Sequence, residues 1–181
     1  DVRFFSAYHW LADPEQALRD NQALSYVRKH IPFKALALHL YNFARSQIFR
    51  WQARNLKDYV LHTPNYILMP FPGPSVTTVH DLSYLHYPQH HPRERIAFME
   101  RQMPRTLAQA AMIITDSDFV RQELIDLLGV AAHRVQTVPL GVEDSFYPRP
   151  PAELPAALTR YGLANLPYLL VVATLEPRKN L

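Results

Sequence analysis

Short apolar runs alternate along this chain with longer stretches whose apolar residues recur at helical spacing. The clearest run covers residues 75–79, which are mostly β-branched and are followed directly by His80-Asp81. Comparable runs cover residues 59–62, 112–115 and 135–140. Such runs are typical of strands buried in a parallel sheet. We therefore predict an α/β domain. Because ligands bind beyond the carboxyl ends of such strands, His80 and Asp81 mark its candidate working face.

The first part of the chain predicts a strand over residues 2–7 and two helices. Asp13-Pro14 is a typical helix start, and this helix extends to about residue 30. The second helix covers about residues 33–55. Its apolar stripe, which we predict to be buried, consists of Leu36, Leu40, Phe43, Ala44, Ile48 and Trp51.

Two more helices are predicted between the later strands. Residues 92–110 form the first. Asp116-Ser117 is interpreted as the cap of the second, and Gly129 ends it. The predicted buried positions of this second helix are Val120, Leu124, Leu127 and Leu128.

The segment 141–151 is rich in turn-forming residues and predicts a domain boundary. We assign residues 1–147 to a Rossmann-like domain and residues 148–181 to a linker and the first strand of a second one. In that second part we predict a short helix over 152–161 and a strand over 168–173. The chain begins without Met inside a predicted strand and stops where a helix is expected to start, so we interpret it as a piece of a longer polypeptide.

Composition excludes several classes of protein. Hydrophobic residues make up 48% of the chain, which excludes a disordered protein, and no run of 18 apolar residues predicts a membrane span. There is no cysteine, which excludes disulfides and zinc thiolates and fits a cytoplasmic location. Only four glycines occur and none forms Gly-x-Gly, so no glycine-rich phosphate loop is present.

Positive charge is concentrated before the first predicted parallel strand. Between residues 28 and 57 the sequence has seven Lys or Arg and no acidic residue. This stretch is either a solvated helix face or a surface for anionic lipid or a polyanionic substrate. We name four of these cations as a candidate membrane or acceptor surface: Lys34, Arg45, Arg50 and Arg54.

Histidines gather after the central strand and raise the question of a metal site. His86, His90 and His91 lie close in sequence, but Pro88 breaks any helix that could place two of them on one face. No acidic residue lies at a suitable spacing. We therefore expect no metal there and interpret the segment as a surface loop.

Five short segments, in this order, resemble the retaining glycosyltransferases of family 4, which have the two-domain GT-B fold. The matching segments are residues 78–84, 111–117, 138–143, 146–148 and 174–181. The last is the most specific and is similar to a mannosyltransferase-like branch that builds bacterial surface polysaccharides. The resemblance covers roughly residues 59–181. Ala173 and Leu140 depart from the family pattern, where Gly and Asn are usual.

The resemblance implies a reaction and roles for four residues. Retaining transfer in this family is thought to need no enzymatic nucleophile, so no catalytic carboxylate pair is required, unlike in glycosidases. His80 matches the histidine that faces the sugar near its anomeric centre, and Asp81 either fixes its tautomer or caps the next turn. Arg178 and Lys179 match the donor diphosphate site. No metal or other cofactor is expected, and the donor is a nucleotide-diphosphate sugar, with GDP-mannose or GDP-rhamnose favoured.

Two functions of different classes remain open at this stage. The first is the acceptor-side half of a hexosyltransferase that acts on a glycan or lipid-linked acceptor in the cytoplasm, at the inner face of the membrane. The family's first glycine-containing loop and donor-binding Glu-x7-Glu element are absent, so we expect the chain alone to be inactive. The second is a non-catalytic α/β module that binds a polyanion or anionic membrane. A sugar-phosphate epimerase relative of the GT-B fold is a further alternative, and no nucleic-acid partner is expected.

Overall fold

The computed structural model describes residues 2–6, 8–13, 34–150, 153–164 and 166–180, without the side chains of residues 34–39 and 178. Contacts divide the chain into two compact units, Asp1–Val138 and Pro139–Leu181. The helix predicted at residues 13–30 lies almost wholly outside the described residues. The division by contacts does not test the boundary predicted after residue 147, which stays a prediction.

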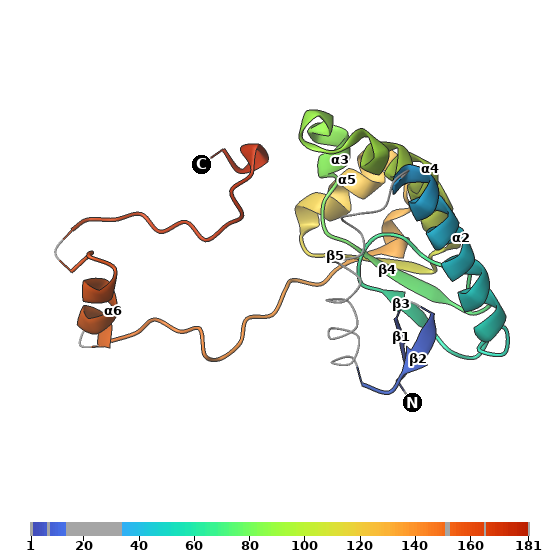
Figure 1. Cartoon of the computed structure of the whole chain (residues 1–181), viewed down its shortest axis with the longest axis horizontal. Coiled ribbons are helices and arrows are strands. Elements are labelled where there is room, and N and C mark those ends of the chain that lie inside the picture. The colour runs from blue at the N-terminus through green and yellow to red at the C-terminus, as the bar shows by residue number, and fades with distance from the viewer. Residues whose placement is uncertain (1, 7, 14–33, 151–152, 165, 181) are drawn as a thin grey trace. The chain divides into compact units, whose positions relative to one another are not determined.

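A parallel sheet with the strand order β3-β4-β5-β6 forms the centre of the first unit (Figure 1). Its strands are Leu61–Thr63, Ser75–Val79, Met112–Thr115 and Val135–Thr137. All three strand pairs are parallel, with Val76 opposite Met112 and Ile113 opposite Val135. This confirms the predicted α/β, Rossmann-like sheet. The last strand ends earlier than predicted, since Pro139 has no N–H with which to extend the ladder.

Helices join the strands in the predicted order. β4 is connected to β5 by α3 (Ser83–His86), the 3₁₀ turn η1 (Pro88–His90) and α4 (Arg93–Gln109). α5 (Asp118–Leu128) and the 3₁₀ turn η2 (Ala132–Arg134) connect β5 to β6. The Ser117 Oγ accepts a hydrogen bond from the Val120 N–H at 3.3 Å, and Gly129 ends α5 in the left-handed conformation with φ of 64°. Both caps of α5 were predicted from the sequence.

The main apolar core lies between the sheet and helices α4 and α5. Val79, Ile113 and Leu124 are fully buried, and Met103 is nearly so. One position of the predicted α5 stripe is wrong, because Leu127 is 53% exposed. The stripe of α5 is therefore narrower than its apolar residues suggested.

The N-terminal residues form a small hairpin rather than one strand over residues 2–7. β1 (Phe4–Ser6) pairs antiparallel with β2 (His9–Leu11), with Phe5 opposite Trp10. Both rings pack on Phe49 of α2, at centroid distances of 4.8 and 5.7 Å. Phe71 lies 6.2 Å from the same ring. These four rings form a second apolar cluster in the first unit.

Helix α2 (Lys34–Gln52) buries a different face from the one predicted. Phe49 and Ala53, just after its end, are fully buried, whereas Leu40, Phe43 and Trp51 are 61%, 64% and 65% exposed. The aromatic cluster around Phe49 decided which face of α2 is covered, and the predicted stripe was the wrong one.

The second unit contains the helix α6 (Leu154–Arg160) and the 3₁₀ turn η4 (Pro177–Lys179). Residues 168–173, predicted as a strand, are not in one, and Leu169 and Val172 are 98% and 89% exposed. No described strand pairs with them, and an unpaired strand cannot satisfy its backbone hydrogen bonds. Among the described residues, no helix is long and apolar enough to cross a membrane.

Candidate functional site

The candidate site lies at the carboxyl edge of the sheet, where three neighbouring strands end. Pro64, His80 and Asp116 each directly follow the last residue of their strand, β3, β4 and β5 respectively. The register places Val79 opposite Thr115, so the residues after them become neighbours. Parallel strands thus bring together three residues that are up to 52 positions apart in sequence.

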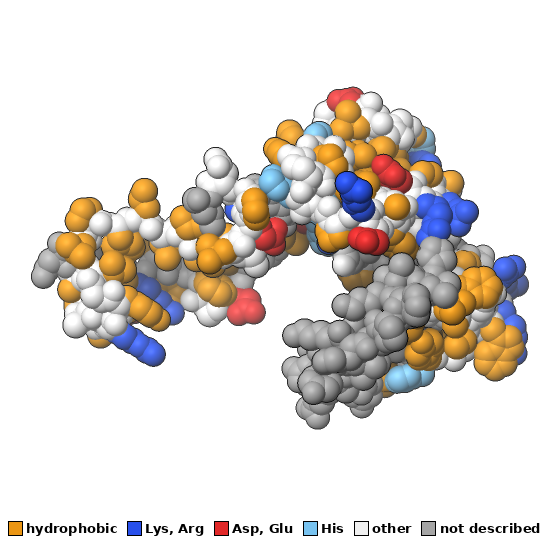
Figure 2. Space-filling model, turned by 45° about the horizontal axis from the view of Figure 1, so that its top comes forward, with side chains coloured by type: hydrophobic (Ala, Val, Ile, Leu, Met, Phe, Trp, Pro, Cys, Tyr) orange, Lys and Arg blue, Asp and Glu red, His pale blue; other side chains and the backbone are white. Residues whose placement is uncertain are grey.

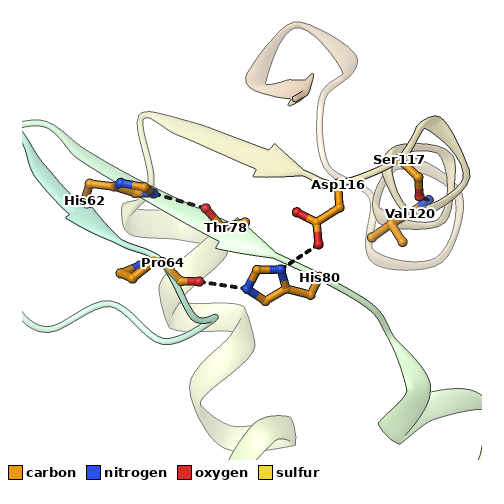
Figure 3. A network of polar contacts seen from close by, with 7 residues as sticks. All are labelled: His62, Pro64, Thr78, His80, Asp116, Ser117 and Val120. Carbon is orange, nitrogen blue, oxygen red and sulfur yellow. Dashed lines mark hydrogen bonds and ion pairs between the residues drawn. The ribbon is translucent and has the colours of Figure 1, made fainter. Parts of the chain in front are cut away.

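Both ring nitrogens of His80 make polar contacts (Figure 3). Nδ1 lies 2.7 Å from Asp116 Oδ2, and Nε2 lies 2.8 Å from the carbonyl oxygen of Pro64. A carbonyl oxygen can only accept a hydrogen bond, and an ionised carboxylate also accepts. Both bonds are therefore made together only when each ring nitrogen carries a proton. The arrangement favours an imidazolium at this edge of the sheet.

The electrostatics of His80 point the same way. The hydrogen bond to Asp116 raises the pKa of His80 above its usual value, and the contact with Pro64 and the charges of Asp116 and Asp81 add to this effect. Partial burial opposes the shift but does not cancel it. The imidazole side chain is 39% exposed and Asp116 is 20% exposed, so the ring can still be reached from solvent. These contacts favour the protonated, hydrogen-bond-donating form of His80 at the edge of the parallel sheet.

Asp81 does not hold the ring of His80. Its Oδ1 accepts the N–H of Ser83 at 3.0 Å, which is the turn-capping alternative of the sequence analysis. Asp81 also interacts with the phenol of Tyr66. Burial, with the Asp81 charge as the second cause, raises the pKa of Tyr66 to about 12. The tautomer-fixing role suggested for Asp81 was therefore wrong, and a catalytic role for Asp81 remains a prediction.

Tyr66 itself is a residue that sequence reasoning missed. It has a φ of 57°, which is uncommon for a bulky side chain. Its N–H donates to the Thr78 carbonyl at 2.9 Å and its own carbonyl accepts from Thr77 Oγ1 at 2.5 Å. Its ring lies edge-on to His80 at 5.9 Å. β4 thus fixes Tyr66 beneath the imidazole in a conformation that is costly in isolation.

Asp116 is the more important omission. We interpreted Asp116-Ser117 as one helix cap, but only Ser117 caps α5, and Asp116 contacts His80 instead. The signal that could have found it is positional. Asp116 follows a predicted strand directly, as His80 does, and adjacent parallel strands end at the same edge.

The other candidate residues lie elsewhere. Arg50 is exposed on α2 and Arg54 is exposed in the turn that follows it, whereas Arg45 is half-buried with its guanidinium 5.9 Å from the Phe5 ring. Lys34 begins α2, and its side chain is not described. Lys179 is exposed in the second unit, in η4 rather than at the helix start that we expected. The side chain of Arg178 is likewise not described.

The loop histidines do not converge. His86 Nε2 contacts Glu123 of α5, and His91 Nε2 lies 3.0 Å from Ser83 Oγ. Glu123 is an acidic partner that sequence spacing did not reveal. Within the part of the chain that the structure describes, no three His, Asp or Glu side chains gather in a way that could hold a metal ion.

Comparison with known proteins identifies the family of the chain. The profile of the family described as Glycosyltransferase Family 4 matches residues 2–146. The O-antigen chain mannosyltransferase B of Escherichia coli is 35% identical over 166 residues, which are 92% of this chain and 42% of that protein. The chain thus spans about two fifths of the curated relative it matches. The profile match extends over most of the chain, and the chain belongs to glycosyltransferase family 4.

Proposed function

We infer that this chain is the acceptor-side part of a retaining glycosyltransferase that transfers mannose or a related hexose. The donor is a nucleotide-diphosphate sugar. The acceptor is a glycan or lipid-linked glycan in the synthesis of a bacterial surface polysaccharide. Family membership and the printed name of the relative support the reaction class. The observation that carries the assignment to this site is the contact of Asp116 with His80 at the carboxyl edge of the sheet.

His80 is the proposed catalytic residue. As an imidazolium it can donate from Nε2 to an oxygen of the donor, either a sugar hydroxyl or an oxygen of the departing phosphate. In the structure that proton is directed at the carbonyl of Pro64. We propose that the ligand oxygen takes the place of this carbonyl, while the Asp116 contact keeps the ring in position. Asp116 is then a positioning residue, because it acts through His80.

The diphosphate needs further positive charge. Leaving-group stabilisation by cations is the main requirement of a transfer that uses no enzymatic nucleophile. His80 supplies one cation, and its charge is partly balanced by Asp116. We assign the remaining charge to Arg178 and Lys179, on the basis of the family motif around them. No metal and no organic cofactor is part of this proposal.

We further propose that the protein works at the cytoplasmic face of the membrane. The basic stretch of α2 supports this more strongly than its sequence did. Leu40, Phe43 and Trp51 were predicted to be buried, but they are exposed on the helix that carries Arg50 and leads into the turn at Arg54. In Figure 2 orange apolar and blue basic side chains lie side by side on the right of the view, where α2 lies in Figure 1. Basic and aromatic side chains together suit a bilayer interface.

The test is a transfer assay with the full-length protein. GDP-mannose, GDP-rhamnose and UDP-glucose would each be offered with a mannose-containing oligosaccharide acceptor. Mass spectrometry would detect the addition of one sugar, and NMR its anomeric configuration. We expect transfer with retention from a GDP-linked donor and its loss in His80→Ala. A product of inverted configuration, or a His80→Ala variant as active as the wild type, would contradict the proposal. A lack of transfer from all donors would favour the non-catalytic module.

A further inference from the structure

A cleft of about 810 Å³ lies in the first unit, remote from the site around His80. It is lined by residues of α2, by the loop that precedes β4, and by the last residue of α4. These residues are Gln47, Arg50, Trp51, Arg54, Pro70–Pro72 and Gln109. The loop leads into the first residue of β4, and α4 ends three residues before β5 begins. The cleft therefore belongs to the amino edge of the sheet, opposite the carboxyl edge that holds His80.

The charge of this cleft is unbalanced. Two guanidinium groups line it, and no carboxylate is among the lining residues that the structure describes. Arg54 is held in place, because Nη1 donates to the carbonyl of Trp51 at 2.8 Å and the guanidinium lies 4.7 Å from the Trp51 ring centroid. Arg50 is exposed, and no hydrogen bond or ion pair joins it to another residue that the structure describes. Cations left without a counter-charge in a concave site favour an anionic ligand.

The cleft continues into an exposed apolar surface. Leu40, Phe43, Gln47, Arg50 and Trp51 follow one another at intervals of one to four residues and share one face of α2. Three of these are large apolar side chains that are more than 60% exposed. A soluble phosphate or sugar needs no such surroundings, whereas a lipid headgroup brings an apolar phase next to the anion.

We propose that this cleft binds the phosphate-bearing headgroup of an anionic phospholipid, while the exposed apolar residues of α2 enter the membrane interface. This inference rests on the proposed membrane location and deepens it. A diffuse basic surface would attract any anionic membrane without a defined binding position, whereas a cleft with two guanidinium groups holds one headgroup at a fixed place. The Gln47 amide, which also lines the cleft, can donate further hydrogen bonds to headgroup oxygens.

The experiment measures co-sedimentation of the full chain with two kinds of vesicle. One kind contains phosphatidylglycerol in phosphatidylcholine, and the other contains phosphatidylcholine alone, each at low and high salt. We expect retention on the anionic vesicles only. For the double variant R50Q/R54Q we expect at least about a tenfold loss of binding, since each cation near an anionic surface contributes about 1 kcal/mol. The control R93Q/R160Q removes the same charge from two residues that do not line the cleft.

A second pair of variants separates the cleft from general electrostatics. Gln47→Glu places a carboxylate in the cleft, and Gln89→Glu makes the same chemical change in η1, outside it. We expect Gln47→Glu to weaken binding about fivefold and Gln89→Glu to have a much smaller effect. Equal losses from the two variants would overturn the cleft and leave only diffuse attraction. Equal losses from R50Q/R54Q and R93Q/R160Q would do the same.

Trp51 reports directly on the occupant. In a Trp10→Phe background, Trp51 is the remaining tryptophan of the chain. We expect its emission to shift to shorter wavelength with anionic vesicles and not with inorganic phosphate. A shift with phosphate alone, or retention on phosphatidylcholine, would overturn the lipid assignment in favour of a soluble anion or a purely apolar partner. Sugar transfer by the wild type is measured separately, so a failure of the cleft is distinguishable from a failure of the proposed enzyme.

Discussion

The two edges of the sheet differ in whether their ionisable side chains have partners within the chain. At the carboxyl edge, His80 contacts Asp116 and Tyr66 interacts with Asp81, so each ionisable group has a partner within the chain. At the amino edge, Arg50 and Arg54 line a cleft in which no described residue supplies a carboxylate. The two edges are separated by the length of β4, roughly 17 Å for a strand of this size. A side chain that is paired within the chain is held in one position, as a catalytic group must be. A charged side chain without such a partner is available to bind an ion or ligand of opposite charge.

The largest expected effect concerns the carboxyl edge. His80→Ala should lower kcat of the full-length protein by roughly a hundredfold or more, with a smaller change in donor binding, because the contact is made at the reacting centre. Asp116→Asn should cost roughly tenfold and also move the pH–rate profile to lower pH, because the neutral amide no longer favours the imidazolium.

Steady-state kinetics over a range of pH would test both variants of this edge. Asp81→Asn provides a comparison, since Asp81 acts on His80 through its charge alone. A pH profile in Asp116→Asn that matches the wild type would show that Asp116 has only a structural role.

The next prediction concerns the residues that supply positive charge to the diphosphate. Because Asp116 partly neutralises the charge of His80, most of the positive charge must come from the family motif in the second unit. Lys179→Ala should therefore reduce both donor affinity and kcat by about tenfold, since the diphosphate is charged in the ground state and in the transition state. Isothermal titration with the nucleotide sugar, followed by kinetics, measures the two parts. A change in kcat with no change in affinity would contradict this assignment.

A smaller effect is expected from a substitution in the closely packed loop at Gly73, at the amino edge. A Cβ at Gly73 would lie 2.6 Å from the carbonyl oxygens of Lys57 and Tyr59. These are backbone atoms that cannot move aside cheaply, so Gly73→Ala should lower the free energy of unfolding by about 1–3 kcal/mol. Gly141→Ala is the matched control, because nothing lies within 4 Å of its added Cβ. Urea unfolding compares the two, and equal stabilities would contradict the close packing of this loop.

The smallest effect is the pH dependence of stability at the carboxyl edge. The pKa of His80 is raised in the folded chain above the value of 6.5 for an unperturbed histidine. Its contribution is therefore complete below pH 6.5 and is lost as the pH rises through the higher folded pKa. We expect the melting temperature to fall over that interval in the wild type and to fall less in Asp116→Asn. An equal fall in both proteins would show that the Asp116 contact does not stabilise the imidazolium.

Several features of the first unit were determined by the sequence alone. Each parallel strand was predicted close to its position, and the caps of α5 at Ser117 and Gly129 were predicted correctly. The position of His80 at the end of a buried strand was also evident. These features depend on residues that are close in sequence, namely a β-branched run, a serine at a helix start and a glycine at a helix end. Local sterics and local hydrogen bonds are sufficient to specify them.

The tertiary structure decided every feature that required a partner distant in sequence. The strand at residues 75–79 formed because β3 and β5 pair with it, whereas the more apolar segment 168–173 has no paired strand among the described residues. Phe49 packs against the hairpin and Phe71, and this contact left Leu40 and Trp51 exposed.

Asp116 reached His80 because two parallel strands end side by side. The physical reason is the same in each of these cases. A side chain or backbone group is stabilised only by the groups that it contacts. For these residues the contacting group is far away in the sequence, where no local pattern reveals it.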